Sequence, residues 1–207
     1  MDKNEKVMRY REANLSVQKG QIVFAGSSLM EQFPVEKLLK ERGIEVTVYN
    51  RGISGYVTDE LMANLDVCVT DLQPRCVFIN IGTNDLSNPE LSIGDVMERY
   101  DAIITTIEQR VPGVRIYMMA YYPINYDAAA DFMKPNLAVR TNEKIASANE
   151  QVKLLAKKHG QRYIDVNRAL KDEQGRLRAE YTFEGMHIRE EGYRAIMDDL
   201  IPYVLEA

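Results

Sequence analysis

Four short segments of the chain contain residue types that together could carry out acyl transfer. They are Gly-Ser-Ser-Leu at 26–29, Asn-Arg-Gly-Ile-Ser-Gly at 50–55, Gly-Thr-Asn-Asp at 82–85 and Glu-Gly-Met-His at 184–187. Acyl transfer requires a nucleophile, a base that a third group orients, and hydrogen-bond donors for the developing oxyanion. The serine, histidine, carboxylate, glycine and asparagine residues of these segments can supply those functions.

The candidate nucleophile, general base and acid are Ser28, His187 and Glu184. A neutral imidazole can take the serine proton and later return it to the leaving alcohol. Glu184 lies three residues before the histidine, and at this separation a carboxylate in an irregular turn can reach back to the imidazole. The other histidine, His159, is in a polar segment, and we expect it to be a surface or packed residue.

Ser28 and Glu184 each allow a second interpretation. Ser28 could be a helix N-cap, and Ser27 could be the nucleophile in its place. Glu184 could be a solvated loop carboxylate, which would leave Ser28 and His187 as a dyad assisted by a backbone carbonyl. We expect the triad, with Ser28 as the nucleophile.

The predicted oxyanion hole consists of the backbone N–H groups of Ser28 and Gly55 and the side-chain amide of Asn84. A glycine lets the main chain approach the developing charge closely, and an asparagine amide is a well-placed neutral donor. The alternatives are an ordinary turn glycine and an asparagine that caps a loop. Asp85 is expected to brace the loop rather than to contact a substrate.

A longer segment at 121–135 follows the fourth predicted strand and could border the same site. Its Tyr126, Phe132 and Met133 could form one wall of an acyl or leaving-group pocket. A loop packed on itself is an equally good interpretation. Arg140 and its neighbours could also reach this rim, although capping of the next helix explains Asn142.

The elements that would position these residues alternate between two patterns. One is a short run of apolar residues, and the other is a helical stripe, a segment in which apolar residues recur with the period of a helix. The runs, at 22–25, 46–49, 76–81, 114–119 and 162–165, predict five strands. The run at 76–81 is almost continuously apolar, as expected of a strand covered on both faces. Apolar residues recur with a helical period at 96–111, where Ser92 and Asp95 could cap the start, at 145–156 and at 193–204.

Five successive strand–helix units predict a parallel sheet with helices on both faces, a three-layer α/β/α sandwich with a five-stranded parallel sheet. Ligands bind at the carboxyl ends of the strands in such sheets. Three of the four segments directly follow a predicted strand, and the fourth precedes the final helix, so all four should meet at one edge. We expect one domain at 21–207, with residues 1–20 as a helical arm packed on its outside.

Composition narrows the class of protein. The chain has 207 residues and a net charge of −5 with no basic cluster, which argues against a nucleic-acid partner. The charged N-terminus is followed by no apolar run, and no segment has the length of a membrane span, so a cytoplasmic location is expected. Cys68 and Cys76 are too close to suggest a disulfide framework, and two histidines offer little for a metal site.

Taken in order, the four segments resemble the signature blocks of the SGNH (GDSL-type) hydrolases. The tracts at 50–56 and 180–187 also resemble the platelet-activating-factor acetylhydrolase-like branch. Two positions depart from the family pattern: Ser27 and Glu184 each stand where the family usually has aspartate. The resemblance implies a flavodoxin-like fold and serine esterase chemistry without a cofactor, and the branch makes a homodimer plausible.

The expected function is therefore that of a serine esterase, a carboxylic ester hydrolase that cleaves small, short-acyl esters through an acyl-enzyme on Ser28. A sugar acetyl ester or an ether-lipid-like acetyl ester is the expected substrate. A lysophospholipase or thioesterase is an alternative within the hydrolases. A catalytically silent module that binds a small molecule or carbohydrate is the alternative outside them. A phosphate-binding protein is disfavoured because the first turn lacks a glycine-rich phosphate loop.

Overall fold

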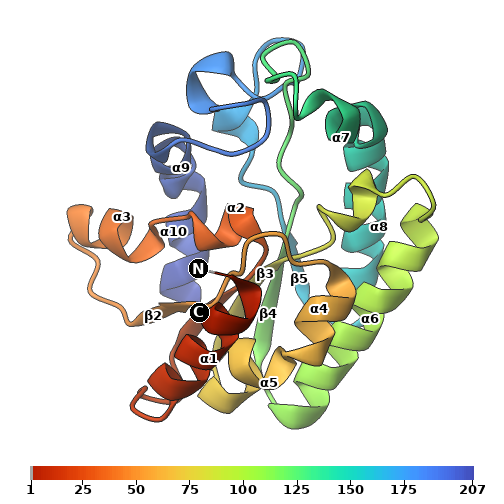
Figure 1. Ribbon diagram of the computed structural model, residues 1–207. Coiled ribbons are helices and arrows are strands. Elements are labelled where there is room, and N and C mark those ends of the chain that lie inside the picture. Colours follow the sequence, from red (N-terminus) through yellow and green to blue (C-terminus); the bar gives the residue numbers. More distant parts are fainter. Residues whose placement is uncertain (1) are drawn as a thin grey trace.

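A parallel sheet with the strand order β2-β1-β3-β4-β5 forms the centre of the computed structural model, which describes residues 2–207. The strands are β1 (Ile22–Gly26), β2 (Val48–Asn50), β3 (Cys76–Asn80), β4 (Arg115–Met119) and β5 (Arg162–Ile164). Every pairing between neighbouring strands is parallel. The predicted three-layer α/β/α sandwich with a five-stranded parallel sheet is confirmed (Figure 1).

Helices connect the strands and cover both faces of the sheet. The α-helices are α1 (Lys3–Asn14), α2 (Ser28–Glu31), α3 (Val35–Glu41), α4 (Thr58–Ala63), α5 (Leu65–Cys68), α6 (Ile93–Arg110), α7 (Lys134–Val139), α8 (Asn142–Lys158), α9 (Glu190–Ala195) and α10 (Met197–Glu206). Short 3₁₀ helices are η1 (Thr70–Leu72), η2 (Asp85–Ser87), η3 (Arg168–Leu170) and η4 (Ala179–Tyr181).

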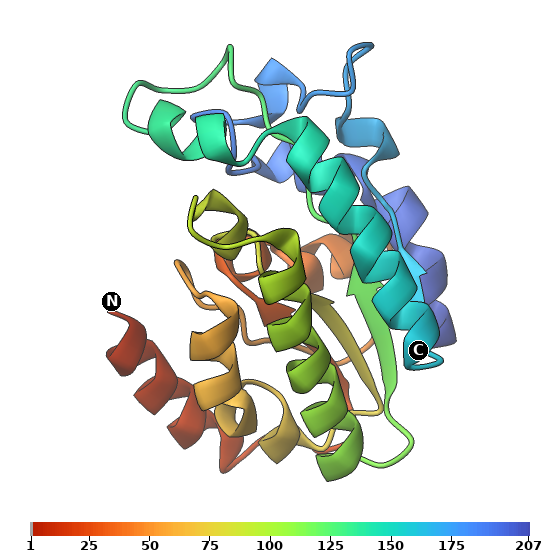
Figure 2. The same ribbon diagram turned by 90° about the vertical axis from the view of Figure 1, so that its right-hand side faces the viewer.

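The two faces of the sheet carry separate hydrophobic clusters, because alternate strand residues point to opposite sides. Val77 and Ile79 belong to the cluster that includes side chains of α4, α5, α6 and α8. Phe24 and Phe78 belong to the cluster that includes side chains of α2, α3, α9 and α10, and their rings stack with centroids 4.6 Å apart. The turned view in Figure 2 shows α8 and α6 running alongside the sheet.

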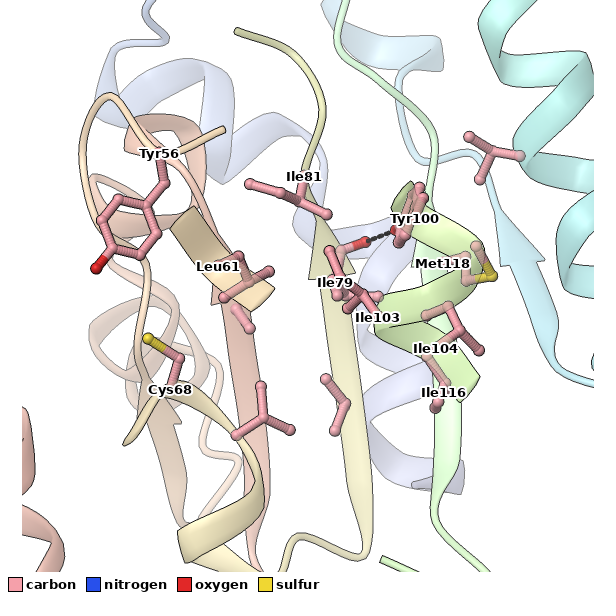
Figure 3. Close-up of a cluster of buried hydrophobic side chains, with 14 of the residues drawn as sticks. Tyr56, Leu61, Cys68, Ile79, Ile81, Tyr100, Ile103, Ile104, Ile116 and Met118 are labelled. Carbon is pink, nitrogen blue, oxygen red and sulfur yellow. Dashed lines mark hydrogen bonds between the residues drawn. The ribbon is translucent and has the colours of Figure 1, made fainter. Parts of the chain in front are cut away.

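The predicted helical stripe at 96–111 corresponds to α6. Its apolar residues Val96, Tyr100, Ile103, Ile104 and Ile107 are all buried. Figure 3 shows several of them against β3 and β4, with the Tyr100 hydroxyl donating to the carbonyl of Ile79 at 3.3 Å. The predicted cap is present, since Ser92 accepts from the N–H of Asp95 and Asp95 accepts from the N–H of Ser92.

Four of the five predicted strands match the observed bounds to within one residue, whereas the second strand and the last helical stripe differ more. The second strand was expected at 46–49, but β2 starts at Val48, which lies opposite Ile22 at the start of β1. As an edge strand, β2 pairs with β1 alone, and β1 itself begins at Ile22. The last stripe was expected as one helix, yet it divides at Ile196 into α9 and α10. Both helices bury the same face, so the apolar period continues across the division.

The N-terminal segment contains α1, which begins with a capping box between Asp2 and Glu5. Val7 is buried on its inner side, and the helix contacts α5. The boundary of the predicted arm at residue 20 stays a prediction. Among residues 2–207, no helix combines the length and the apolar character that a membrane crossing requires.

Candidate active site

Ser28 is placed by the abrupt end of β1. Gly26 ends the strand with φ +152°, and a Cβ there would lie 2.1 Å from the carbonyl oxygen of Asn80 on β3, so a larger residue would push the strands apart. Ser27 is the N-cap residue of α2, and Ser28 is the first residue of that helix. The chain thus turns from strand to helix within two residues and brings the Ser28 hydroxyl to the carboxyl edge of the sheet.

A chain of hydrogen bonds joins Ser28, His187 and Glu184. The imidazole Nε2 lies 3.0 Å from the Ser28 Oγ, and the Nδ1 lies 2.7 Å from Oε1 of Glu184. A carboxylate only accepts, so Nδ1 carries the hydrogen and the neutral ring presents Nε2 as an acceptor for the serine hydroxyl. Both distances are within the reach required of a general base and its orienting group.

The geometry distinguishes between the alternatives for Ser27 and Glu184. Among the residues that the structure describes, the buried hydroxyl of Ser27 has no hydrogen-bond partner, whereas that of Ser28 meets His187. Glu184 is 8% exposed and bonded to the histidine, so it is not a solvated loop carboxylate. The catalytic roles themselves stay predictions.

The turn that carries Glu184 and His187 is closed by its own hydrogen bonds. Thr182 pairs with Ile188 in an isolated antiparallel bridge. The Thr182 hydroxyl accepts from the N–H of Gly185 at 2.9 Å and donates to the carbonyl of His187 at 2.8 Å. Gly185 has φ +94°, and a Cβ there would lie 2.5 Å from the carbonyl oxygen of Asn125. A glycine between the acid and the base therefore lets the turn close against the neighbouring loop.

The loop that contains Gly55 lies beside the end of β1 and is bonded to the Asn84 side chain of the other predicted donor loop. The N–H of Ile53 donates to the carbonyl of Gly26 at 3.0 Å, which brings the 50–55 loop beside the end of β1. Gly55 follows in this loop with φ +76°. The Asn84 amide donates to the carbonyl of Tyr56 at 2.9 Å, and this bond holds the side chain in one orientation. Oxyanion binding by Gly55 and Asn84 stays a prediction.

Asp85 joins the same two loops from within the protein. Its buried carboxylate accepts from the Thr58 hydroxyl at 2.5 Å and from the Thr58 N–H at 3.1 Å. Thr58 begins α4, directly after the loop that contains Gly55. Asp85 therefore braces the loops, in agreement with the expectation from the sequence.

The three residues proposed for a pocket wall have different environments. Met133 is buried in the hydrophobic cluster that also contains Leu137 and Met186, so it packs in the core. Phe132 is 73% exposed. Tyr126 lines a cavity of about 450 Å³ between the loop after β4 and the start of α8. Their contact with a substrate stays a prediction.

Arg140 connects two of the catalytic segments, a role that the sequence did not reveal. It is 1% exposed, and its Nη1 donates to the carbonyl of Thr83 at 2.8 Å while Nη2 contacts Sδ of Met186. Burial lowers the pKa of its guanidinium to about 10, and the negative charge of Glu184 acts in the opposite direction. An arginine just before a helix cap gives no sequence signal that it is buried.

The remaining histidine and the cysteines are outside this arrangement. His159 lies between Asp101 of α6, at 2.6 Å, and Glu108 of α6, at 2.8 Å, and packs α8 on α6. Cys68 and Cys76 are buried, and burial raises the pKa of both thiols to about 12, so neither is a thiolate at neutral pH. Within residues 2–207, no three His, Cys, Asp or Glu side chains are grouped as a metal site would need.

Comparison with known proteins gives a family match and close structural relatives. The model of the GDSL-like lipase/acylhydrolase family matches residues 28–195. A solved structure from Streptococcus pneumonia, provisionally described as a platelet activating factor, is 30% identical and has a TM-score of 0.86. That comparison covers 97% of this chain and 92% of the other.

Two further similarities are more distant. The acetylxylan esterase of Geobacillus stearothermophilus is 15% identical, with 91% of this chain and 95% of that chain covered and a TM-score of 0.68, which shows the fold alone. The N-acylneuraminate cytidylyltransferase of Escherichia coli O18:K1:H7 is 23% identical over 192 residues, or 88% of this chain. The chain spans 40% of the length of that curated relative.

Proposed function

The chain belongs to the GDSL-like lipase/acylhydrolase family, and on this basis we propose that it is a serine esterase that hydrolyses small carboxylic esters through an acyl-enzyme on Ser28. The observation that carries the proposal is the continuous hydrogen-bonded path from Ser28 Oγ through His187 to Glu184, at 3.0 and 2.7 Å. Glu184 and His187 are three positions apart and lie 156 and 159 positions after Ser28, yet the three residues are bonded in the order that acyl transfer requires.

In the first half-reaction, Ser28 Oγ attacks the ester carbonyl carbon while its proton moves to Nε2 of His187. The resulting oxyanion accepts hydrogen bonds from the N–H groups of Ser28 and Gly55 and from the Asn84 amide. The bond to the alcohol oxygen then breaks, and the imidazolium returns the proton to that oxygen. Glu184 stays ionised throughout and keeps the Nδ1–H in place.

In the second half-reaction, water replaces the alcohol. His187 takes one proton from the water as its oxygen attacks the acyl carbon. The tetrahedral intermediate then collapses, the carboxylic acid leaves, and Ser28 Oγ recovers its proton from His187. The atoms balance as one ester and one water converted to one acid and one alcohol.

The proposed substrate class is a short-acyl ester, with an O-acetyl group on a carbohydrate as the first to examine. The similar structure from Geobacillus stearothermophilus is named as an acetylxylan esterase, and the curated relative is named as an N-acylneuraminate cytidylyltransferase. Both names describe those proteins, and the first supports carbohydrate acetyl esters as the first substrates to test for this chain.

The test is hydrolysis of p-nitrophenyl esters from acetate to octanoate by the wild type and by Ser28→Ala. We expect the highest turnover on acetate and a loss of at least about 10⁴-fold in kcat for the variant, because serine acts as a unit with its base. Highest turnover on octanoate would move the proposal to lipid esters. Turnover that is equal in the variant, or absent on every ester and on acetylated oligosaccharides, would contradict it.

A further inference from the structure

One face of α1 directs three polar side chains toward the loop that contains Gly55 and toward the adjacent α2. Lys3, Lys6 and Tyr10 are spaced by three and four positions, which places them on the same side of a helix. Figure 1 shows the N-terminal end of α1 toward the edge of the fold from which α2 and α4 begin. The Lys3 Nζ donates to the carbonyl of Gly55 at 2.9 Å, and the Tyr10 hydroxyl donates to the carbonyl of Gly52 at 2.9 Å.

Lys6 acts on the loop through an ion pair with α2. Its Nζ lies 2.7 Å from Oε1 of Glu31, and Oε2 of Glu31 accepts from the N–H of Ser54 at 2.6 Å. Burial acts to raise the pKa of Glu31, but the hydrogen bonds from Lys6 and Ser54 outweigh it and lower that pKa. The carboxylate therefore stays charged and bonded to both partners at neutral pH.

Lys3 forms a second ion pair with α4. Its Nζ lies 2.7 Å from both carboxylate oxygens of Glu60, and Oε2 of Glu60 accepts from the N–H of Val57 at 3.0 Å. The loop is thus bonded at the N–H of Ser54, just before Gly55, and at the carbonyl of Gly55 itself. The peptide group that carries the Gly55 N–H lies between these two attachments.

This segment has one hydrogen bond of its own, from the Tyr56 N–H to the carbonyl of Ile53 at 3.2 Å, which closes the turn around Ser54 and Gly55. Ser54 and Gly55 are exposed, and Gly55 adopts φ +76°, a region that only glycine enters freely. The same lack of a side chain that allows a close approach to an oxyanion also gives this peptide a wider range of backbone conformations. Bonds from α1 and α2 therefore add to this turn hydrogen bond in fixing the direction of the Gly55 N–H.

We propose that α1 is a positioning element of the active site, and that Lys3, Lys6 and Tyr10 together hold the N–H of Gly55 in the orientation that oxyanion stabilisation needs. The proposal rests on the proposed esterase function, in which Gly55 is an oxyanion donor. Because the oxyanion exists only in the transition state, loss of this support lowers kcat and leaves KM nearly unchanged.

The experiment compares the double variant Lys3→Met/Lys6→Met with the control Arg11→Met. Arg11 is on the same helix, but its partner is Asp66 of α5, at 4.0 Å, and not the loop. Ion pairs that are partly exposed, as the Lys3–Glu60 and Lys6–Glu31 pairs are, typically contribute about 1 kcal/mol or less each, so the folded state should survive in both variants. Tyr10→Phe removes one hydroxyl and provides a third variant that preserves the packing of the ring.

Two measurements are made on each full-length variant. The first is kcat and KM on the best ester, where we expect the double variant to lose on the order of 10- to 100-fold in kcat, since a misplacement of about 1 Å can cost about 10²-fold. The second is hydrogen–deuterium exchange of a peptide covering residues 50–57, where we expect faster exchange in the double variant. The charge-preserving variant Lys3→Arg/Lys6→Arg should recover most of both properties.

The outcomes separate this proposal from the proposed function. Unchanged kcat and unchanged exchange in the double variant would overturn the positioning role, and so would an equal loss in Arg11→Met. A change in KM with kcat unchanged would also overturn the positioning role. If the wild type shows no turnover that depends on Ser28, the esterase proposal fails, and the exchange measurement then decides whether α1 holds the loop.

Discussion

Oε1 of Glu184 accepts hydrogen bonds from both the backbone N–H and the Nδ1–H of His187, at 2.9 and 2.7 Å. One oxygen thus fixes the main chain of the turn and the orientation of the imidazole together. A buried carboxylate is stable only when it is bonded in this way, and the side chain of Glu184 is only 11% exposed. The side chain of Glu184 therefore reaches the imidazole Nδ1 from three positions away.

The first prediction concerns this contact. Glu184→Gln keeps the size of the side chain but removes its charge and can stabilise the wrong tautomer of the ring. We expect kcat on p-nitrophenyl acetate to fall on the order of 10³- to 10⁴-fold, as for the corresponding change in other triads. The control is Glu180→Gln, whose side chain is 61% exposed. Wild-type kcat in Glu184→Gln would show that Ser28 and His187 work as a dyad.

Asn84→Ala tests the side-chain donor of the oxyanion hole. Loss of one such donor lowers kcat by about 10²- to 10³-fold, with a small effect on KM, because the bond forms in the transition state. The same change removes the hydrogen bond to the carbonyl of Tyr56. The midpoint temperature of unfolding is therefore measured as well, to separate a loss of stability from a loss of the donor. Asn88→Ala, in the exposed part of the same loop, is the control. A change in KM alone would argue against the assigned donor.

The lowered pKa of Glu31 predicts how the free energy of unfolding depends on pH. Its pKa is lower in the folded protein than its usual value of 4.5, so the folded state binds fewer protons there than the unfolded chain. The ion pair with Lys6 therefore contributes stability above that value, and the contribution is lost as the pH falls through the lower folded pKa.

Urea unfolding of wild type and Glu31→Gln at about pH 7 and about pH 3 measures this effect. We expect the variant to be less stable at the higher pH, by no more than about 1 kcal/mol because the pair is partly exposed. The difference in free energy of unfolding between wild type and Glu31→Gln should be smaller at the lower pH. Glu36→Gln, whose side chain is 67% exposed, should show little difference at either pH. A difference that grows on acidification would contradict the assigned direction.

The glycine in the catalytic turn allows a matched steric test. Gly185→Ala introduces a Cβ 2.5 Å from the carbonyl oxygen of Asn125, whereas Gly175→Ala, at a similar positive φ of +76°, meets nothing within 4 Å. Both variants carry backbone strain of about 1 kcal/mol, but only the first must move the turn. We expect a clear loss of kcat in Gly185→Ala and wild-type kcat in Gly175→Ala. Equal kcat in the two variants would show that the close packing at Gly185 does not matter for catalysis.

Much of the fold could be predicted because its signals are local. The continuous apolar run at 76–81 corresponds to β3, and the stripe of α6 and its capping box involve residues a few positions apart. The order of strand and helix then limits the sheet to a parallel one. The start of β2 and the division at Ile196 could not be predicted, since strand pairing decides the first and the apolar period does not mark the second.

In the candidate site, too, some features follow from local sequence signals and others depend on contacts between distant segments. Residue type and segment order identified Ser28, Asn84, Glu184 and His187, because turn glycines and the short acid–base spacing are visible in the sequence. The docking of α1 on the Gly55 loop and the burial of Arg140 were not visible, since they depend on bonds between residues 52 and 57 positions apart. The contact between Ser28 and His187 spans 159 positions. Such a distance depends on how strand, turn and helix pack, so the tertiary structure alone decides whether the residues meet.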